Sequence, residues 1–227
     1  MAIKFFDALI FDLDGTLIDS VPDVRANMNK VLVAGGRREV SIDDIKSAVG
    51  WGGRELVERS MIRAGKPGTP DEIDEQLAAF LASYAANPVE HTVIYPGVQE
   101  VLENLRGDGI AMGICTNKPT ATAMPVLDAT GLGQFFSVVS CGDVAKHKKP
   151  DGRHILDVIE QLNATAKSSA MIGDSETDID AALDAGVKSV AVTFGYAHRP
   201  HHELGADAVI DHFFDLPQAL KNVSGGR

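Results

Sequence analysis

The feature that most constrains this chain is a short apolar run, Ala8–Phe11, which ends on two aspartates one residue apart, Asp12 and Asp14, and then Gly15. A short apolar run bounded by turn residues is typical of a strand buried in a parallel sheet. In open α/β sheets, the chemistry gathers at the carboxyl ends of such strands. Two carboxylates held close together need a shared proton or a cation, and hard oxygen ligands favour Mg²⁺. The sequence therefore predicts an acidic, cation-binding site at a strand end.

Helical periodicity dominates the next part of the chain, residues 21–87, in four segments separated by glycine-rich joints. Further along, short apolar runs alternate with amphipathic segments, which is typical of a parallel sheet with helical crossovers. The strands expected there are 110–115, 136–140, 169–172, 189–193 and 208–210. We therefore predict an α/β fold with a small helical bundle inserted into the first crossover.

Composition limits the kinds of partner. The net charge of −11 argues against sequence-independent binding of nucleic acid, because no basic excess is present to neutralise phosphates. A small anionic substrate is compatible with this net charge, since a metal ion and a lysine at the site make the local electrostatic potential positive although the whole chain is negative. Cys115 and Cys141 lie in or beside apolar runs and are expected to be reduced thiols. Without a signal-peptide pattern or an apolar stretch of spanning length, the expected compartment is the cytoplasm, with no membrane contact.

The stretch Asp12-Leu13-Asp14-Gly15-Thr16 resembles the first motif of the haloacid dehalogenase-like superfamily, whose members are mostly Mg²⁺-dependent phosphatases. The resemblance implies a Rossmann-like core of residues 1–19 and 92–227, with residues 20–91 inserted as a helical cap domain. The predicted helical bundle lies between the first and second motifs, where one large subgroup carries its cap. A cap there would close over the site, exclude water and contact the part of the substrate that is not phosphate.

The same resemblance gives roles to the two aspartates. Asp12 is the expected nucleophile, forming an aspartyl-phosphate, and Asp14 the expected general acid and then general base. The side chain of Asp12 and the backbone carbonyl of Asp14 are expected to bind Mg²⁺, whose charge lets an anion approach a dianion. The alternative is a turn with two solvated aspartates. Because dehalogenases of this superfamily lack the second aspartate, Asp14 argues against cleavage of a carbon–halogen bond.

Thr116-Asn117-Lys118 follows a predicted strand and resembles the second motif. In that role Thr116 and Asn117 would bind the oxygens of the transferring phosphoryl group. The alternative is that they only cap the helix that follows.

Lys149 resembles the lysine of the third motif, which holds the nucleophile and the phosphoryl oxygens together. Lys146 and Lys148 are close enough to leave the register open, and a solvated basic loop is the alternative. Gly152 stands where the family usually has a second proline, which predicts a looser loop.

The stretch 173–178, Gly-Asp-Ser-Glu-Thr-Asp, resembles the fourth motif, Gly-Asp-x-x-x-Asp. Asp174 is expected to complete the Mg²⁺ shell with Asp12. Asp178 would bind the ion through water or orient Lys149. The alternative is that both aspartates only favour a helix N-terminus.

The glycine-rich turn 50–54 falls where such caps contribute residues that select the substrate. Gly52 would allow the backbone to approach the substrate closely. Arg54 would bind a carboxylate of the substrate through a forked hydrogen bond. The alternative is a plain helix–helix turn with an exposed arginine. With Thr116-Asn117-Lys118 and the chain length, the turn resembles the phosphoglycolate phosphatase family. The expected reaction is hydrolysis of 2-phosphoglycolate to glycolate.

Other functions stay open. A mutase resembling β-phosphoglucomutase would pass the phosphoryl group to a sugar, although its second motif is usually serine-rich. A phosphatase for a sugar phosphate, nucleotide or pyrophosphate is another possibility, and a non-catalytic binding protein is a third. The expected partner is a small phosphorylated metabolite, and the chain is expected to be a monomer or a homodimer. The seven histidines match no zinc-binding pattern and are expected at the surface.

Overall fold

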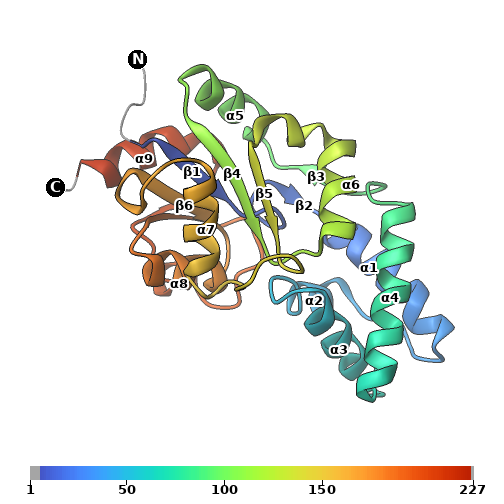
Figure 1. The fold of residues 1–227 in the computed structure, drawn as a ribbon. Helices are drawn as coiled ribbons and strands as arrows, with labels where there is room; N and C mark the ends of the chain where they lie inside the picture. Colours follow the sequence, from blue (N-terminus) through green and yellow to red (C-terminus); the bar gives the residue numbers. More distant parts are fainter. Residues whose placement is uncertain (1–5, 226–227) are drawn as a thin grey trace.

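The computed structural model describes residues 6–225, and within them a six-stranded parallel sheet has helices on both faces (Figure 1). The strand order is β5-β4-β1-β6-β7-β8. The outer limits of the two expected domains, residues 1 and 227, lie outside the described residues. The strands are β1 (Ala8–Phe11), β4 (Ala111–Thr116), β5 (Val138–Cys141), β6 (Ser169–Gly173), β7 (Lys188–Val192) and β8 (Ala208–Ile210). The predicted parallel α/β sheet is therefore confirmed, with strand ends that differ from the predicted ones by no more than two residues.

The central strand β1 is fully buried because helices cover it from both sides, which explains its unbroken apolar sequence. Leu9 and Phe11 face the layer that contains α5 (Val98–Gly107), α6 (Thr120–Thr130) and α9 (Leu216–Ser224). Ala8 and Ile10 face the opposite layer, formed by α7 (Arg153–Gln161) and α8 (Glu176–Ala185). Successive side chains of a strand point to opposite faces, so one short run supplies both cores.

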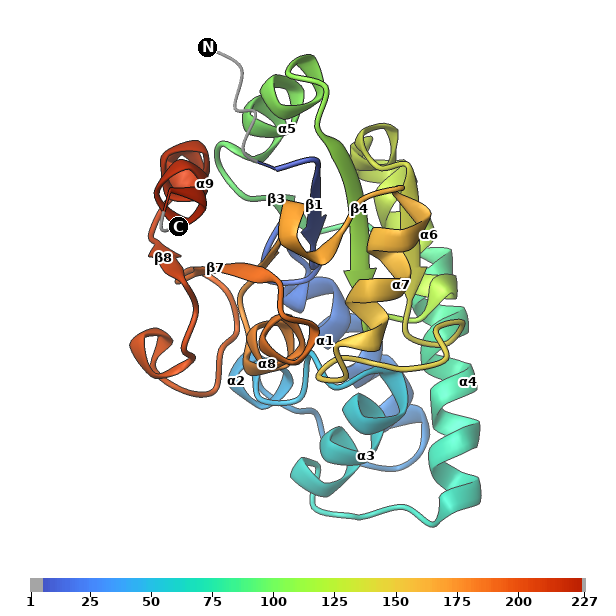
Figure 2. The ribbon, with the colours of Figure 1, turned by 60° about the vertical axis from the view of Figure 1, so that its left-hand side comes forward.

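The first crossover contains the predicted helical unit, made of α1 (Val21–Ala34), α2 (Ile42–Lys46), α3 (Gly53–Arg63) and α4 (Pro70–Ala86). Figure 2 shows these helices gathered beyond the arrowheads of β1 and β4, where the strands end. Their apolar faces pack on one another, and α4 also contacts α6 of the sheet layer. The unit therefore stands over the edge of the sheet at which the predicted site residues emerge.

A small antiparallel ribbon joins this unit to the sheet. The sequence predicts irregular chain at residues 15–20, but β2 (Ile18–Asp19) pairs there with β3 (Val93–Ile94). A short, two-residue pairing carries too little periodicity to be recognised from sequence. Just beyond it, the buried carboxylate of Asp23 accepts hydrogen bonds from the backbone N–H groups of residues 90, 91 and 92 and from Thr92 Oγ1. The outgoing and returning chains are thus fixed to each other at the base of the helical unit.

Two predictions about single side chains have different outcomes. Cys115 and Cys141 are buried free thiols, as expected. The surface prediction is wrong for His154, which is fully buried on α7 with its Nε2 at 2.9 Å from Ser140 Oγ. Burial lowers the pKa of His154 to about 4, so this imidazole is neutral near pH 7.

In the described part of the chain, no helix has both the length and the apolar character needed to cross a membrane.

Candidate active site

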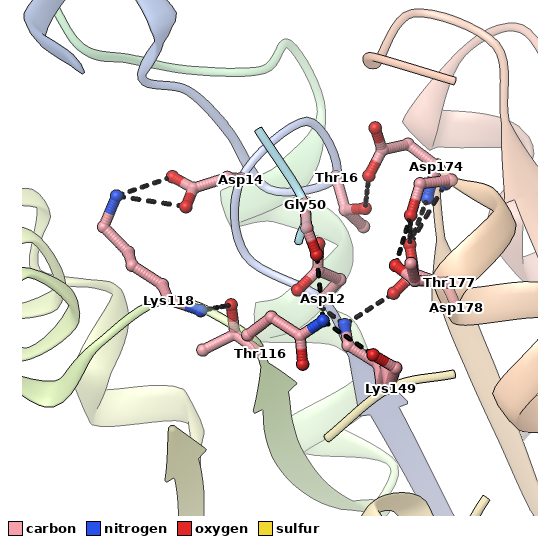
Figure 3. A network of polar contacts seen from close by, with 12 residues as sticks. Asp12, Asp14, Thr16, Gly50, Thr116, Lys118, Lys149, Asp174, Thr177 and Asp178 are labelled. Atoms are coloured by element: carbon pink, nitrogen blue, oxygen red, sulfur yellow. Dashed lines mark hydrogen bonds and ion pairs between the residues drawn. The ribbon is translucent and has the colours of Figure 1, made fainter. Parts of the chain in front are cut away.

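The four motifs meet at one edge of the sheet (Figure 3). Asp12 follows β1, Thr116 is the last residue of β4, Lys149 lies in the loop after β5, and Asp174 follows β6. These strands are neighbours in the order β5-β4-β1-β6, and all are parallel. Their carboxyl ends therefore place the four side chains around a common point, as expected for an open α/β sheet.

Lys149 lies at the centre of this arrangement. Its Nζ donates to Asp12 Oδ1 at 2.8 Å and to Asp178 Oδ1 at 2.5 Å, and the residue is only 3% exposed. Burial alone would lower the pKa of Lys149, but the two carboxylates outweigh it and raise the pKa. Lys146 and Lys148 are exposed. Of the three candidate lysines, Lys149 is therefore the one that contacts the proposed nucleophile.

Gly152 does not loosen the loop that follows Lys149. Its N–H donates to Asp184 Oδ2 at 2.8 Å, and the loop packs closely on α8. A Cβ at this position would lie 2.5 Å from the backbone nitrogen of Ala185. The loop is held by this close approach, so the expectation of a looser segment is wrong.

Three buried carboxylates form an acidic cluster, which consists of Asp12, Asp174 and Asp178. One oxygen from each lies within 4.8 Å of the others. Burial raises the pKa of Asp12 to about 6 and raises that of Asp174 well above its usual value, and the neighbouring carboxylates add to both effects. Lys149 offsets only one of the three negative charges when all are ionised. The remaining charge and the oxygen donors suit a divalent cation.

The protein orients these carboxylates by hydrogen bonds. Asp174 accepts from Thr16 Oγ1 at 3.1 Å and from the Tyr196 N–H at 2.6 Å. Asp178 Oδ2 accepts from Ser175 Oγ at 2.7 Å and from the Ser175 N–H at 3.0 Å, which leaves its other oxygen for Lys149. This is the lysine-orienting arrangement that the sequence suggests for Asp178.

Asp14 lies apart from the acidic cluster. Both of its oxygens accept from Lys118 Nζ at 3.0 Å, and one also accepts from Ser20 Oγ. Ser20 directly precedes α1, where a serine is a common helix cap, but its hydroxyl contacts Asp14 and makes no capping hydrogen bond to the helix. The ammonium group of Lys118 lies 4.8 Å from the centre of the Tyr84 ring.

Lys118 is the site residue that the sequence prediction misses. It belongs to the second-motif stretch, but nothing in the local pattern indicates that its ammonium would be buried against Asp14. Its side chain is 5% exposed. Burial alone would lower the pKa of Lys118, whereas Asp14 and the Tyr84 hydroxyl raise it above the usual value.

Asn117 links three parts of the site. Its Nδ2 donates to the carbonyl of Gly50 and to that of Lys149, both at 2.9 Å. The hydroxyl of its neighbour Thr116 is buried and accepts from the Lys118 N–H at 3.2 Å. The Oδ1 of Asn117 is buried and has no hydrogen-bond partner among the described residues. This side chain therefore ties the glycine-rich turn to the lysine loop.

A small cavity lies between the strand ends and the helical unit, with about 50 Å³ of free space. Its lining residues are Asp12, Asp14, Val24, Val49, Gly50, Gly52, Gly53, Leu56, Phe80, Thr116, Asn117, Lys118, Pro119 and Thr122. Gly52 has a φ of +99°, a conformation that favours glycine, and this lets the turn reach the strand ends. Arg54 is not among the lining residues. It is 47% exposed and contacts Asp74 at 3.1 Å and Glu58 at 3.8 Å.

Comparison with known proteins agrees with the motifs. Residues 9–192 match the model of a family described as haloacid dehalogenase-like hydrolase. The chain belongs to this family. The phosphoglycolate phosphatase of Agrobacterium fabrum is 40% identical over 219 residues, covering 96% of this chain and 94% of that protein. The phosphoglycolate phosphatase of Caulobacter vibrioides is 38% identical, covering 93% and 89%.

A solved structure also shares the whole fold. It is described as a predicted phosphoglycolate phosphatase from Haemophilus somnus and superimposes with a TM-score of 0.89 at 30% identity, covering 94% of this chain and 97% of that one. The chain therefore carries a hydrolase domain of a kind that works with a divalent metal, and the buried acidic cluster fits that requirement.

Proposed function

We propose that the protein is a Mg²⁺-dependent phosphatase that hydrolyses 2-phosphoglycolate to glycolate and inorganic phosphate. The observation that carries the proposal is the acidic cluster at the strand ends, with Lys149 bound to both Asp12 and Asp178. The relatives named phosphoglycolate phosphatase, about 40% identical over nearly the whole chain, support the choice of substrate.

In the first step, a carboxylate oxygen of Asp12 attacks phosphorus and the bond between phosphorus and the glycolate oxygen breaks. Asp14, entering as the carboxylic acid, gives its proton to that oxygen, so that glycolate leaves as an alcohol. In the second step, water attacks the aspartyl-phosphate and gives a proton to the Asp14 carboxylate. Cleavage of the phosphorus–oxygen bond to Asp12 then releases inorganic phosphate and restores both side chains.

Other residues position the phosphoryl group. Lys149, fixed by Asp178, would bind a phosphoryl oxygen beside Asp12 and stabilise the charge that develops there. Thr116 and Asn117 would bind the other oxygens with a hydroxyl and with backbone N–H groups. The side chains of Asp12 and Asp174, with the Asp14 carbonyl, would hold Mg²⁺. When bound, the ion supplies positive charge that lowers the repulsion between the nucleophile and the phosphate.

Residues 20–91 would act as a cap domain over a core of residues 1–19 and 92–227. The β2–β3 pair and the Asp23 hydrogen bonds lie where such a unit would pivot. Gly52 would bring the cap turn against the substrate. The substrate would enter the cavity that Gly52 lines together with Asp12, Asp14 and Lys118. Arg54 would have to leave Asp74 and Glu58 to reach this space, so we do not assign the substrate carboxylate to it.

A phosphate-release assay tests this proposal. The purified protein would receive 2-phosphoglycolate, glucose 6-phosphate, a nucleoside monophosphate and pyrophosphate, each with Mg²⁺ or with EDTA. We expect metal-dependent release with the highest kcat/KM for 2-phosphoglycolate, and no release by Asp12→Asn. A profile led by a sugar phosphate would contradict the substrate assignment. Conversion of β-glucose 1-phosphate to glucose 6-phosphate, followed by NMR with a trace of the bisphosphate, would instead indicate a mutase.

A further inference from the structure

We propose that Lys118 determines substrate specificity by binding a carboxylate on the leaving group, one methylene away from the bridging oxygen of the phosphate ester. The inference rests on the proposed function and deepens it, because it names the residue that distinguishes 2-phosphoglycolate from an uncharged phosphate ester. It also replaces Arg54 as the candidate for that contact.

The first support is the position of the ammonium group. Among the described residues that line the cavity, Lys118 is the one cationic side chain. Lys149 lies on the far side of Asp12 and is not part of the lining. A carboxylate that entered this space, between the apolar side chains of Val24, Leu56 and Phe80, would find Lys118 as its one buried positive side chain, since the Lys148 ammonium near Gly52 belongs to an exposed residue. An unpaired charge in such surroundings is strongly disfavoured.

The second support is the distance between Lys118 and the proposed acid. Both oxygens of Asp14 lie 3.0 Å from Lys118 Nζ. For proton transfer, an Asp14 oxygen must be within hydrogen-bond reach of the bridging oxygen. A group one methylene from that oxygen then lies next to Asp14, where the ammonium group is located. A carboxylate attached further along a longer chain would be carried past it.

The third support is that Lys118 is held in place before any ligand arrives. Its side chain is 5% exposed, bonded to Asp14 and in contact with the face of the Tyr84 ring. An ammonium fixed in this way loses little conformational entropy when it binds a ligand. Lysine has three donors; Lys118 Nζ directs two of them at Asp14 and makes only a 3.5 Å contact to the Tyr84 hydroxyl, which a substrate carboxylate can replace while the bond to Asp14 is kept. By contrast, Arg54 is 47% exposed and already paired on the outer side of α3.

The test compares 2-phosphoglycolate with ethyl phosphate, in which a methyl group replaces the carboxylate. For Lys118→Met we expect kcat/KM to fall about 100-fold more for 2-phosphoglycolate than for ethyl phosphate, because a hydrogen bond between charged groups is lost. Much of the difference should appear in KM. Lys118→Arg, which keeps the charge, should retain part of the preference. Lys30→Met, which removes an exposed charge on α1, should leave both substrates unaffected.

The outcomes separate the two proposals. If wild type prefers 2-phosphoglycolate and Lys118→Met lowers kcat/KM by the same factor for both esters, Lys118 does not recognise the carboxylate and the inference is wrong. If wild type shows no preference for 2-phosphoglycolate at all, the proposed function fails and the inference fails with it. Should Lys118→Met not fold, as judged by circular dichroism, Lys118→Gln is measured in its place. A preference fully retained by that variant would equally overturn the inference.

Discussion

In the absence of metal, replacing Asp12 with asparagine should make the protein more stable at pH 7.5. Burial raises the pKa of Asp12 from 3.8 to about 6, which corresponds to about 3 kcal/mol between the charged and neutral forms. A carboxyl whose pKa is higher in the folded state contributes stability that is fully present below its unfolded pKa and is lost as the pH rises through the folded one. The free energy of unfolding of wild type should therefore fall by about 2.5 kcal/mol between pH 4 and pH 7.5, whereas that of the neutral asparagine variant should not.

Thermal and urea unfolding in EDTA measure this difference. For a chain of this length, about 3 kcal/mol corresponds to a rise in Tm of roughly 6–12 °C for Asp12→Asn at pH 7.5. Near pH 4.5 the two proteins should melt much closer together, because the wild-type carboxyl is then mostly protonated. Asp71→Asn is the matched control, since it removes one charge from an exposed position in the first turn of α4.

Mg²⁺ should reverse the order of stability. Binding at about 1,000 times Kd would add about 4.1 kcal/mol to the free energy of unfolding of wild type, which exceeds the difference of about 3 kcal/mol in EDTA, while Asp12→Asn, which lacks one proposed ligand charge, should gain much less. If Asp12→Asn is less stable than wild type in EDTA at pH 7.5, Lys149 compensates the buried charge more fully than we infer. An equal gain at pH 4.5 and pH 7.5 would show that the stabilisation has a cause other than ionisation.

Three further outcomes can be measured. Asp23→Ala removes four hydrogen bonds and should lower the free energy of unfolding in urea by about 4 kcal/mol; a loss below 1 kcal/mol would contradict this. The pKa of His154 is lowered to about 4, so the free energy of unfolding of wild type should fall by up to about 3 kcal/mol relative to that of His154→Gln as the pH falls from 6.5 to 4. Parallel pH profiles of the two proteins would refute this. The single tryptophan, Trp51, lies on the cap turn with its ring centre 6.0 Å from that of His198. Its fluorescence should change when inactive Asp12→Asn binds 2-phosphoglycolate, and an unchanged spectrum at saturation would indicate a cap that does not move.

Much of the fold and the position of the site could be predicted from sequence because both depend on local patterns. The buried run of β1 and the alternation of strands and helices indicate a parallel sheet. In such a sheet, residues directly after neighbouring strands must lie together, whatever their separation along the chain. Asp12, Thr116 and Asp174 are each marked in this way, since each follows or ends an apolar strand.

Tertiary structure decided which charged side chains face one another. Three lysines near the third motif look alike in sequence, and only the path of the loop packed on α8 places Lys149 against Asp12. The contact between Lys118 and Asp14 joins residues 104 positions apart, and α4 supplies the Tyr84 ring beside it. Arg54 has an equally suitable charge but lies on the outer side of α3. Periodicity predicts which face of an element is buried. The partner of a buried charge depends on how separate elements pack, because only packing removes it from water and brings the opposite charge within reach.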